Sequence, residues 1–257
     1  MASILDMYGI KEVADVVISR IDGNNKYTPV LYLDTLKVST IEETASSTDA
    51  TGGKGNAKLI SWDYGKDISV TLEDALFSPK SMAMMFGGAN AGVNTAAKPI
   101  VKTINYLYTD ASAGTLPAKV YRQTDGTYAT TSDGTDASGT AVTWFLENAS
   151  SSSSVATSGT PGARYIGKFS ITPASSRTIE IDAAHFPGTY RIVGDTYARS
   201  EASGEDEFFQ FIIYKAKVSA ENTITLQADG DPSTFSMNLT VLRTPDGKMM
   251  DLVQYKI

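Results

Sequence analysis

Alternation of apolar and polar side chains at every second position is the feature that most constrains how this chain can fold. It runs through residues 67–73, 223–228 and 235–242. In the first of these segments the apolar side chains are Ile68, Val70 and Leu72, and the polar ones are Asp67, Ser69, Thr71 and Glu73. This period places one face of each strand on a core and the other on water, which indicates antiparallel sheets.

Many further segments have the composition of strands, and turn-forming pairs such as Asp125-Gly126 and Pro187-Gly188 separate them. The expected strands are residues 13–21, 30–43, 58–74, 100–108, 119–123, 142–147, 165–171, 178–182, 189–197, 207–218 and 252–257. So many strands predict a mainly β fold, an antiparallel β-sandwich or barrel-like structure with one short α-helix and a long extended hairpin loop.

The short helix is expected at residues 80–86. Ser78 and Pro79 supply an N-cap and a first-turn proline, and Gly87-Gly88 provides the stop. Its Met82, Met85 and Phe86 should cover one end of the sheet.

The strand pair at 30–43 and 58–74 is unusually long. A strand of about 14 residues spans roughly 46 Å, whereas about 5–6 residues is usual. The joining segment 44–57 is small, polar and rich in glycine, so we expect it to be mobile in an isolated subunit. Composition alone does not separate a functional segment from an ordinary flexible hairpin loop.

Residues 110–163 are dominated by Thr, Ser, Gly, Ala and Asp, with a serine run at 150–154. Only two short strand-like pieces stand out, near Val120 and Trp144. We interpret this region as a surface insertion, or a small extra lobe, within a single β domain that spans residues 1–257.

The residues needed for chemistry are scarce. The chain has no cysteine and one histidine, which excludes thiolate chemistry and histidine-rich zinc sites. No Gly-x-Ser-x-Gly turn accompanies His185. The glycine-rich run at 52–56 lacks the spacing of a phosphate-binding loop, and the acidic clusters at 205–207 and 229–231 lack that of a calcium loop. We expect no enzyme activity, no catalytic residue, no metal and no cofactor.

The charge balance argues against a protein that grips nucleic acid. The formal net charge is −7, from 22 Lys and Arg against 29 Asp and Glu, whereas phosphate binding requires clustered cations. Nucleic acid could still move past such a surface without adhering. We find no signal peptide and no apolar run long enough to span a bilayer, so we expect a soluble protein made in a cytoplasm, without membrane contact.

The polar faces of the alternating strands contain no lysine, arginine or aromatic residue. A sheet that binds sugars or nucleic acid is expected to expose such side chains. Two interpretations of these faces remain open, namely the wall of a channel and an ordinary solvent-exposed surface.

Three blocks of the sequence resemble the tail tube (major tail) proteins of bacteriophages. The first comprises residues 29–42 and 52–67, with Pro-Val-Leu-Tyr-Leu-Asp-Thr-Leu and Ser-Trp-Asp-Tyr-Gly-Lys-Asp; the second is Leu-Glu-Asp-Ala-Leu-Phe-Ser-Pro-Lys-Ser at 72–81; the third is Gly-Asp-Pro-Ser-Thr-Phe-Ser-Met at 230–237. The blocks occur in the family's order, whereas residues 110–163 match nothing in its pattern.

The resemblance implies subunits that close into hexameric rings, and rings that stack into a hollow tube through which DNA is ejected into the host. The partners would be other copies of the chain, with sheath, tape-measure and baseplate or tail-tip proteins as further candidates. DNA would pass without specific binding. The protein would be located in the virion tail after assembly in the host cytoplasm.

The resemblance also assigns residues. A long hairpin loop that reaches the adjacent ring corresponds to residues 44–57, and the contact candidates in it are Asp49, Gly52, Gly53, Lys54, Gly55 and Asn56. The candidates for the lumen wall are Asp67, Ser69, Thr71 and Glu73.

Two rival functions stay open at this point. The first is another virion structural role, such as capsid decoration. The second is a carbohydrate-binding β-sandwich, which would need exposed aromatic side chains; the candidates are Tyr106, Tyr108, Tyr121 and Trp144.

Overall fold

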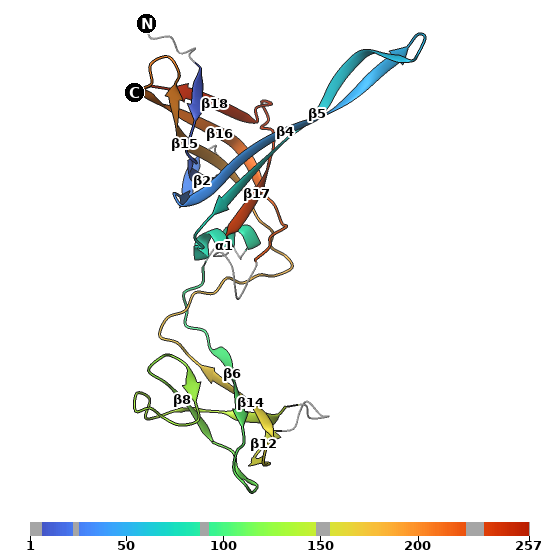
Figure 1. The fold of residues 1–257 in the computed structure, drawn as a ribbon. Coiled ribbons are helices and arrows are strands. Elements are labelled where there is room, and N and C mark those ends of the chain that lie inside the picture. Colours follow the sequence, from blue (N-terminus) through green and yellow to red (C-terminus); the bar gives the residue numbers. More distant parts are fainter. Residues whose placement is uncertain (1–6, 23–25, 88–92, 148–154, 225–233, 257) are drawn as a thin grey trace. The chain divides into compact units, whose positions relative to one another are not determined.

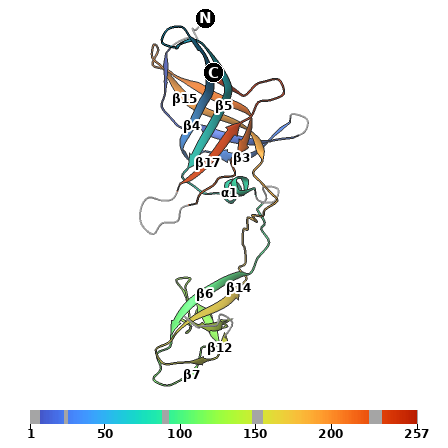
Figure 2. The ribbon, with the colours of Figure 1, turned by 90° about the vertical axis from the view of Figure 1, so that its right-hand side faces the viewer.

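The computed structural model describes residues 7–22, 26–87, 93–147, 155–224 and 234–256 (Figure 1). It is 56% strand and 4% helix with antiparallel sheets, which confirms the mainly β fold, and its described sheets do not close into a barrel. The chain forms two compact units (Figures 1 and 2). Unit 1 comprises Met1–Val93 and Ile179–Ile257, and unit 2 comprises Asn94–Thr178.

A nine-stranded antiparallel sheet forms unit 1, in the order β3-β2-β15-β16-β17-β5-β4, with β1 also paired to β15 and β18 to β16. The strand bounds are β1 Tyr8–Ile10, β2 Asp15–Ile21, β3 Tyr27–Leu33, β4 Leu36–Gly52, β5 Ala57–Asp74, β15 Thr189–Ser200, β16 Asp206–Val218, β17 Phe235–Val241 and β18 Met250–Tyr255.

One face of this sheet carries the core. In β17 every second side chain from Phe235 to Val241 is buried, and the residues between them are exposed. β5 adds Ile68, Val70 and Leu72 to the same core. Burial of one such side chain is worth roughly 1.5–3 kcal/mol relative to exposure, so the predicted alternation determines which face of each strand turns inward.

Helix α1, Pro79–Phe86, has the predicted ends. The Ser78 hydroxyl accepts from the Ser81 backbone N–H at 2.9 Å, and the chain leaves the helix at Gly87 with φ 65°. Met84 and Met85 are buried in the core of unit 1, while Met82 is half-buried. The helix therefore covers the core as expected, with Met84 in place of Met82 as the deeper residue.

The prediction of one strand over residues 30–43 was wrong. Asp34 and Thr35 interrupt it, so that β3 ends at Leu33 and β4 begins at Leu36. Thr35 is tied to the end of β5, because its hydroxyl donates to Asp74 Oδ1 at 2.6 Å. That bond satisfies a buried carboxylate, which is costly to leave unpaired. Nothing local in the sequence marks this tertiary contact as a turn.

Two further strand predictions have different outcomes, and the one at residues 178–182 was wrong. Residues 178–182 form no strand, and only Thr178 makes an isolated bridge, to Asn94. Of the segment 223–228, residues 225–228 lie outside the described residues, and 223–224 are not in a strand.

Unit 2 has its own sheets, with strand orders β12-β11-β14-β6, β10-β8-β9 and β13-β7. The bounds are β6 Ile100–Leu107, β7 Gly114–Thr115, β8 Lys119–Arg122, β9 Tyr128–Ala129, β10 Thr140–Ala141, β11 Thr143–Leu146, β12 Val155–Ala156, β13 Ser158–Gly159 and β14 Arg164–Ile171. Its core is formed by Tyr108, Leu116, Val120, Trp144, Tyr165 and Phe169.

Residues 110–163 contain more structure than the two strand-like pieces predicted, because β7 to β13 all lie within them. The small residues of this region make room for aromatic rings. A Cβ on Gly159 would lie 2.2 Å from Cδ2 of Tyr108, and the Trp144 indole N–H donates to the Pro117 carbonyl at 2.6 Å. A composition that suggests surface loops thus also permits a core of large side chains.

Candidate assembly surfaces

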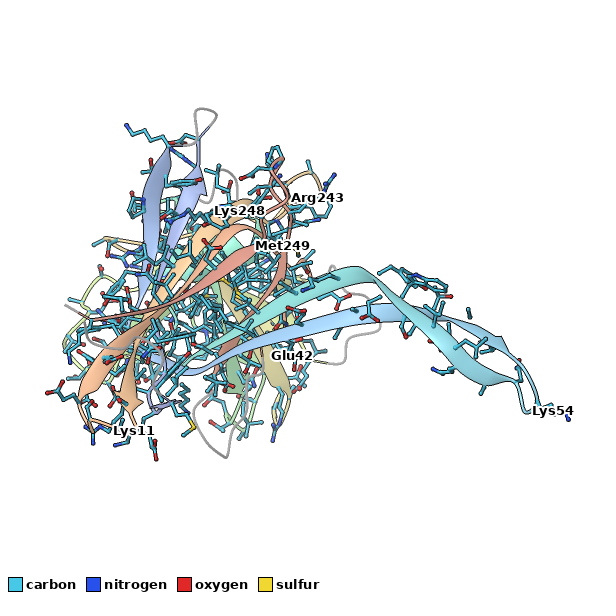
Figure 3. All side chains as sticks on the ribbon, turned by 90° about the horizontal axis from the view of Figure 1, so that it is seen from above. Lys11, Glu42, Lys54, Arg243, Lys248 and Met249 are labelled. Atoms are coloured by element: carbon cyan, nitrogen blue, oxygen red, sulfur yellow. The ribbon has the colours of Figure 1, made fainter. Side chains whose placement is uncertain are left out.

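The β4–β5 hairpin extends well beyond the core of unit 1 (Figures 1 and 3). β4 has 17 residues and β5 has 18, about three times the usual strand length. The outermost core residue of β5 is Ile68, and no side chain of residues 45–66 is buried. We call residues 45–66 the arm.

A bulge at Gly65 determines which face of the arm each side chain occupies. Thr44 pairs with Asp67 and Ser46 with Tyr64, so β5 has one residue more than β4 between these pairs. Gly65 has φ 64°, a left-handed conformation that glycine adopts without strain. Between Gly65 and the end of β5 at Asp74, even-numbered side chains therefore face the core. Between the tip of the arm and Gly65, even-numbered side chains lie on the opposite face.

Three large apolar side chains lie on this non-core face, between the tip of the arm and the bulge. Ile60, Trp62 and Tyr64 are 55%, 53% and 59% exposed. Their cross-strand partners on β4 are the small residues Ala50, Thr48 and Ser46. These partners are too short to cover the larger side chains, which we call the apolar row. These three residues were not among the predicted site residues, although large apolar side chains at every second position, opposite a strand of Ser, Thr and Ala, are a signal that the sequence contains.

The tip of the arm is a four-residue turn at 53–56. Gly53, Gly55 and Asn56 have positive φ, at 78°, 90° and 50°, and the Asn56 N–H donates to the Gly53 carbonyl at 3.2 Å. Lys54 projects from the tip (Figure 3). The structure thus brings Gly53 to Asn56 together, while Gly52 ends β4.

Asp49 lies on β4 rather than in the turn. Its carboxylate forms an ion pair with Lys58 of β5. Hydrogen bonds from Lys58 and then from Ser61 lower the pKa of Asp49 below its ordinary value. Asp49 therefore joins the two strands of the arm.

The joining segment is shorter than the predicted 44–57. β4 continues to Gly52 and β5 starts at Ala57. Thr and Ser fit an extended, paired strand, and the register with β5 runs to the tip, so a polar composition did not prevent strand formation. Mobility in an isolated subunit stays a prediction.

The side chains predicted to line a lumen lie on the face of β5 opposite the core. Asp67 and Ser69 are exposed, and Thr71 and Glu73 are half-buried. Their register neighbours are Val38, Thr40, Glu42 and Thr44 on β4, and Ser236, Asn238 and Thr240 on β17. We call these residues of the three strands the polar face.

The polar face is acidic. It carries the carboxylates of Glu42, Asp67 and Glu73, and none of its residues is a lysine or arginine. Lys217 of β16 pairs with Thr240 at the border of the face. A phosphate backbone would be repelled rather than bound over most of this surface.

The sheet of unit 1 has open edges at β3 and β4, and also at β1 and β18, each of which has one strand partner among the described residues. β3 and β4 terminate the strand order, and within the described part of the chain each pairs on one side only, β3 with β2 and β4 with β5. A strand edge with unpaired N–H and C=O groups recruits another chain. Among the described residues of unit 1, the arm, the polar face and the β4 edge are therefore three neighbouring surfaces without a partner.

A family comparison gives these surfaces a context. The model of the YomU/Tube protein family matches residues 8–254, nearly the full length of the chain. The chain belongs to the YomU/Tube protein family. This membership confirms the predicted resemblance to phage tail tube proteins. None of the curated proteins matches the chain.

Membership of the YomU/Tube family implies a component of the virion tail. No helix among the described residues is long and apolar enough to cross a membrane.

The described residues contain no group of three or more His, Cys, Asp or Glu that could hold a metal. His185 Nδ1 lies 2.6 Å from Asp182 Oδ2, and both side chains are exposed. That the family member has no enzyme activity stays a prediction.

The aromatic residues named for sugar binding do not form an exposed platform in this YomU/Tube member. Tyr108 and Trp144 are 2% and 3% exposed and belong to the core of unit 2. Tyr106 and Tyr121 are half-buried, and the Tyr106 ring packs on Trp144 with centroids 5.2 Å apart. The acidic cluster at 229–231 lies outside the described residues.

Proposed function

We propose that this YomU/Tube family protein closes into hexameric rings, and that the rings stack into a phage tail tube that conducts DNA into the host. The arm carries this proposal. It exposes Ile60, Trp62 and Tyr64 on a two-stranded projection, although large apolar side chains are stabilised by removal from water. A second copy of the chain can cover them.

The open edge of β4 supports the same assembly. Its unpaired backbone groups can continue the sheet into a neighbouring subunit. A head-to-tail contact of this kind uses different surfaces on the two copies, and it closes into a ring when the rotation between subunits divides a full turn. Six subunits, as the family resemblance implies, require a rotation of about 60° at each contact.

The polar face is the surface that we assign to the lumen. Its hydroxyl, amide and carboxylate groups offer no cation to a passing phosphate. Its three carboxylates repel DNA within about one Debye length, ~8 Å at physiological salt. DNA would therefore move along the wall without adhering to it.

The remaining assignments follow from the tube. We assign residues 110–163 to its outer surface, where a sheath would also bind in a contractile tail. The tape-measure protein would lie in the lumen before DNA enters, and baseplate or tail-tip proteins would bind the terminal ring. Assembly would take place in the host cytoplasm.

Electron microscopy of the purified protein over a concentration series tests this function. Rings or hollow tubes of uniform diameter are expected, and tail-tip complexes serve as seeds if nucleation limits assembly. A chain that stays monomeric at high concentration even with seeds would overturn the tube.

A further inference from the structure

A second apolar surface lies on the non-core face of unit 1. Tyr197 of β15, Phe208 of β16 and Tyr255 of β18 are direct cross-strand neighbours. The centroids of their rings are 5.4 and 5.2 Å apart. Tyr197 alternates with the buried Thr196 and Ala198, and it is 52% exposed. We call Tyr197, Phe208 and Tyr255 the aromatic row.

Polar contacts hold the aromatic row in place. The Tyr255 hydroxyl donates to Asp195 Oδ1 at 2.9 Å, and Gln210 Nε2 donates to Asp195 Oδ2 at 2.7 Å. Val253 flanks the row and is 36% exposed. A surface fixed in this way loses little conformational freedom when a partner binds.

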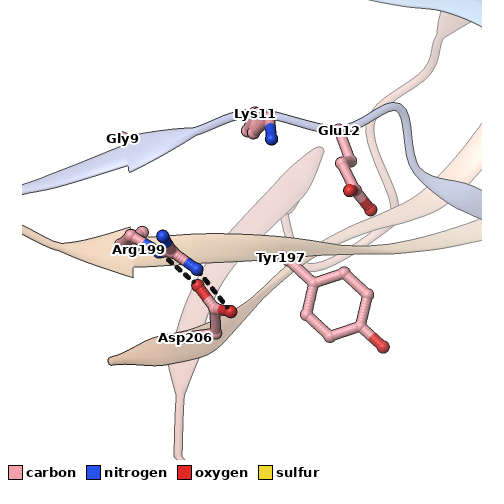
Figure 4. Close-up of a pocket in the computed structure, with 6 residues that line it drawn as sticks. All are labelled: Gly9, Lys11, Glu12, Tyr197, Arg199 and Asp206. Carbon is pink, nitrogen blue, oxygen red and sulfur yellow. Dashed lines mark hydrogen bonds and ion pairs between the residues drawn. The ribbon is translucent and has the colours of Figure 1, made fainter. Parts of the chain in front are cut away.

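A shallow pocket adjoins the row (Figure 4). Tyr197 lines it together with Arg199 and Asp206, whose side chains form an ion pair through two contacts of 2.7 and 2.9 Å. Lys11 and Glu12, which follow β1, close its other side. The exposed ring of Tyr197 is therefore the rim of a concave site.

The arm and the surroundings of the aromatic row have opposite charge. The arm contains three lysines and two aspartates, namely Lys54, Lys58, Lys66, Asp49 and Asp63. The end of the sheet at residues 199–207, together with Lys256, contains four carboxylates and two cations, namely Glu201, Glu205, Asp206, Glu207, Arg199 and Lys256. Complementary charge of this kind favours encounter and fixes register between two copies.

The two surfaces also lie at different ends of the non-core face of unit 1. In Figure 1 the arm projects to the right, whereas the ends of β1, β15 and β18 next to the aromatic row lie on the left. The arm of a subunit therefore points away from its own aromatic row. A head-to-tail contact requires two such separated and complementary surfaces.

We propose that the apolar row of one subunit packs on the aromatic row of a second copy, with Trp62 seated against Tyr197 and the lysine-bearing tip directed to the acidic end of β15 and β16. This contact rests on the proposed tube function and names the surface that receives the arm. It buries the exposed apolar row and the exposed Tyr197 ring at once, and it needs only copies of this chain.

Thiol cross-linking between copies tests the contact, because the chain has no cysteine of its own. Thr48→Cys places a thiol opposite Trp62 in the arm, and Val253→Cys places one beside the aromatic row. Both substitutions leave the two rows intact. The two variant proteins are mixed in equal amounts, assembled, and treated with a short bifunctional thiol reagent. The matched control mixes Thr48→Cys with Leu76→Cys, since Leu76 is 62% exposed on unit 1.

Linked peptides that join position 48 to position 253 are expected in excess over those that join 48 to 76, and a further Trp62→Ser substitution should abolish the excess. Tubes that form without the 48–253 link, or with an equal 48–76 link, would overturn this contact and leave the tube function standing. Failure to assemble under every condition would overturn the tube function, and this contact with it.

Discussion

Thr71 Oγ1 donates a hydrogen bond to Asn238 Oδ1 over 3.1 Å, although the two residues are 167 positions apart in the sequence. The bond joins β5 to β17 on the polar face, where the two residues are direct register partners. Polar groups on this face therefore satisfy one another across the strands. Together with the absence of cations from the face, this leaves little for a phosphate to bind.

Lysine on the polar face should slow the passage of DNA. We expect a Ser69→Lys, Thr71→Lys protein to form normal tubes, because both side chains are on the face opposite the core. Each added lysine repeats in every subunit and can release counterions from the DNA. Infectivity of phage whose tails carry the variant should fall on the order of tenfold or more. DNA-ejection assays would show DNA retained in the virion.

Two controls make this lumen prediction specific. Ser170→Lys adds one lysine, half the charge of the double variant, at an exposed position of unit 2 and should leave infectivity unchanged. Thr71→Val removes the hydrogen bond to Asn238 without adding charge, and it should also leave DNA release unchanged. Full infectivity of the double-lysine variant with normal tails would exclude the polar face from the lumen.

Removal of Lys58 should raise the pKa of Asp49. Lys58 is the main reason that this pKa lies below the ordinary value of 3.8. Because the folded-state pKa is lowered, the ion pair stabilises the arm above pH 3.8, and the stabilisation is lost as the pH falls through the folded-state value. Carboxyl NMR titration should show a midpoint below 3.8 in the parent and a return towards 3.8 in Lys58→Met.

Ser61→Ala is the matched comparison for Lys58→Met, because the Ser61 hydrogen bond is the second cause of the lowered pKa. It should raise the midpoint by less. An unchanged midpoint in Lys58→Met would show that the ion pair across the arm does not persist in solution.

Gly194→Ala should destabilise unit 1. A Cβ at this position of β15 would lie 2.1 Å from Cζ of Phe211, a core residue that is 3% exposed. Overpacking of this kind costs roughly 1–3 kcal/mol, which urea denaturation can measure. Gly9→Ala is the control, because nothing lies within 4 Å of its added Cβ; its stability should be unchanged or raised by up to about 1 kcal/mol.

The sequence predicts those parts of the fold that local chemistry determines. Ser78, Pro79 and Gly87 mark the ends of α1 because capping depends on neighbouring residues alone. The alternation in β5 and β17 likewise predicts the core face and the polar face. The break at Thr35 could not be predicted in the same way, because it depends on a hydrogen bond to Asp74 at the far end of β5.

The apolar row was missed for a related reason. Ile60, Trp62, Ile68 and Leu72 all have even numbers, so a regular period assigns them to one face. Only the bulge at Gly65 separates the exposed pair from the buried pair. A glycine within a strand suggests a bulge, but its register is visible only once β4 is placed against β5.

That bulge provides the last prediction. Gly65→Val should abolish assembly while unit 1 stays folded. A β-branched residue is strained at φ 64°, by roughly 1–2 kcal/mol or more. Regular pairing, in which β4 and β5 pair without the bulge, relieves this strain. Regular pairing shifts the register by one residue and turns Trp62 and Tyr64 to the other face of the arm. Because open space surrounds the Gly65 Cβ position, the effect would arise from the backbone alone. Sedimentation should show subunits in place of tubes, with an unchanged urea midpoint.

Gly65→Asn is the control for this prediction, because asparagine tolerates the left-handed conformation, and it should assemble like the parent. Tubes of normal yield from Gly65→Val would show that the face of the arm occupied by Trp62 and Tyr64 does not matter for assembly.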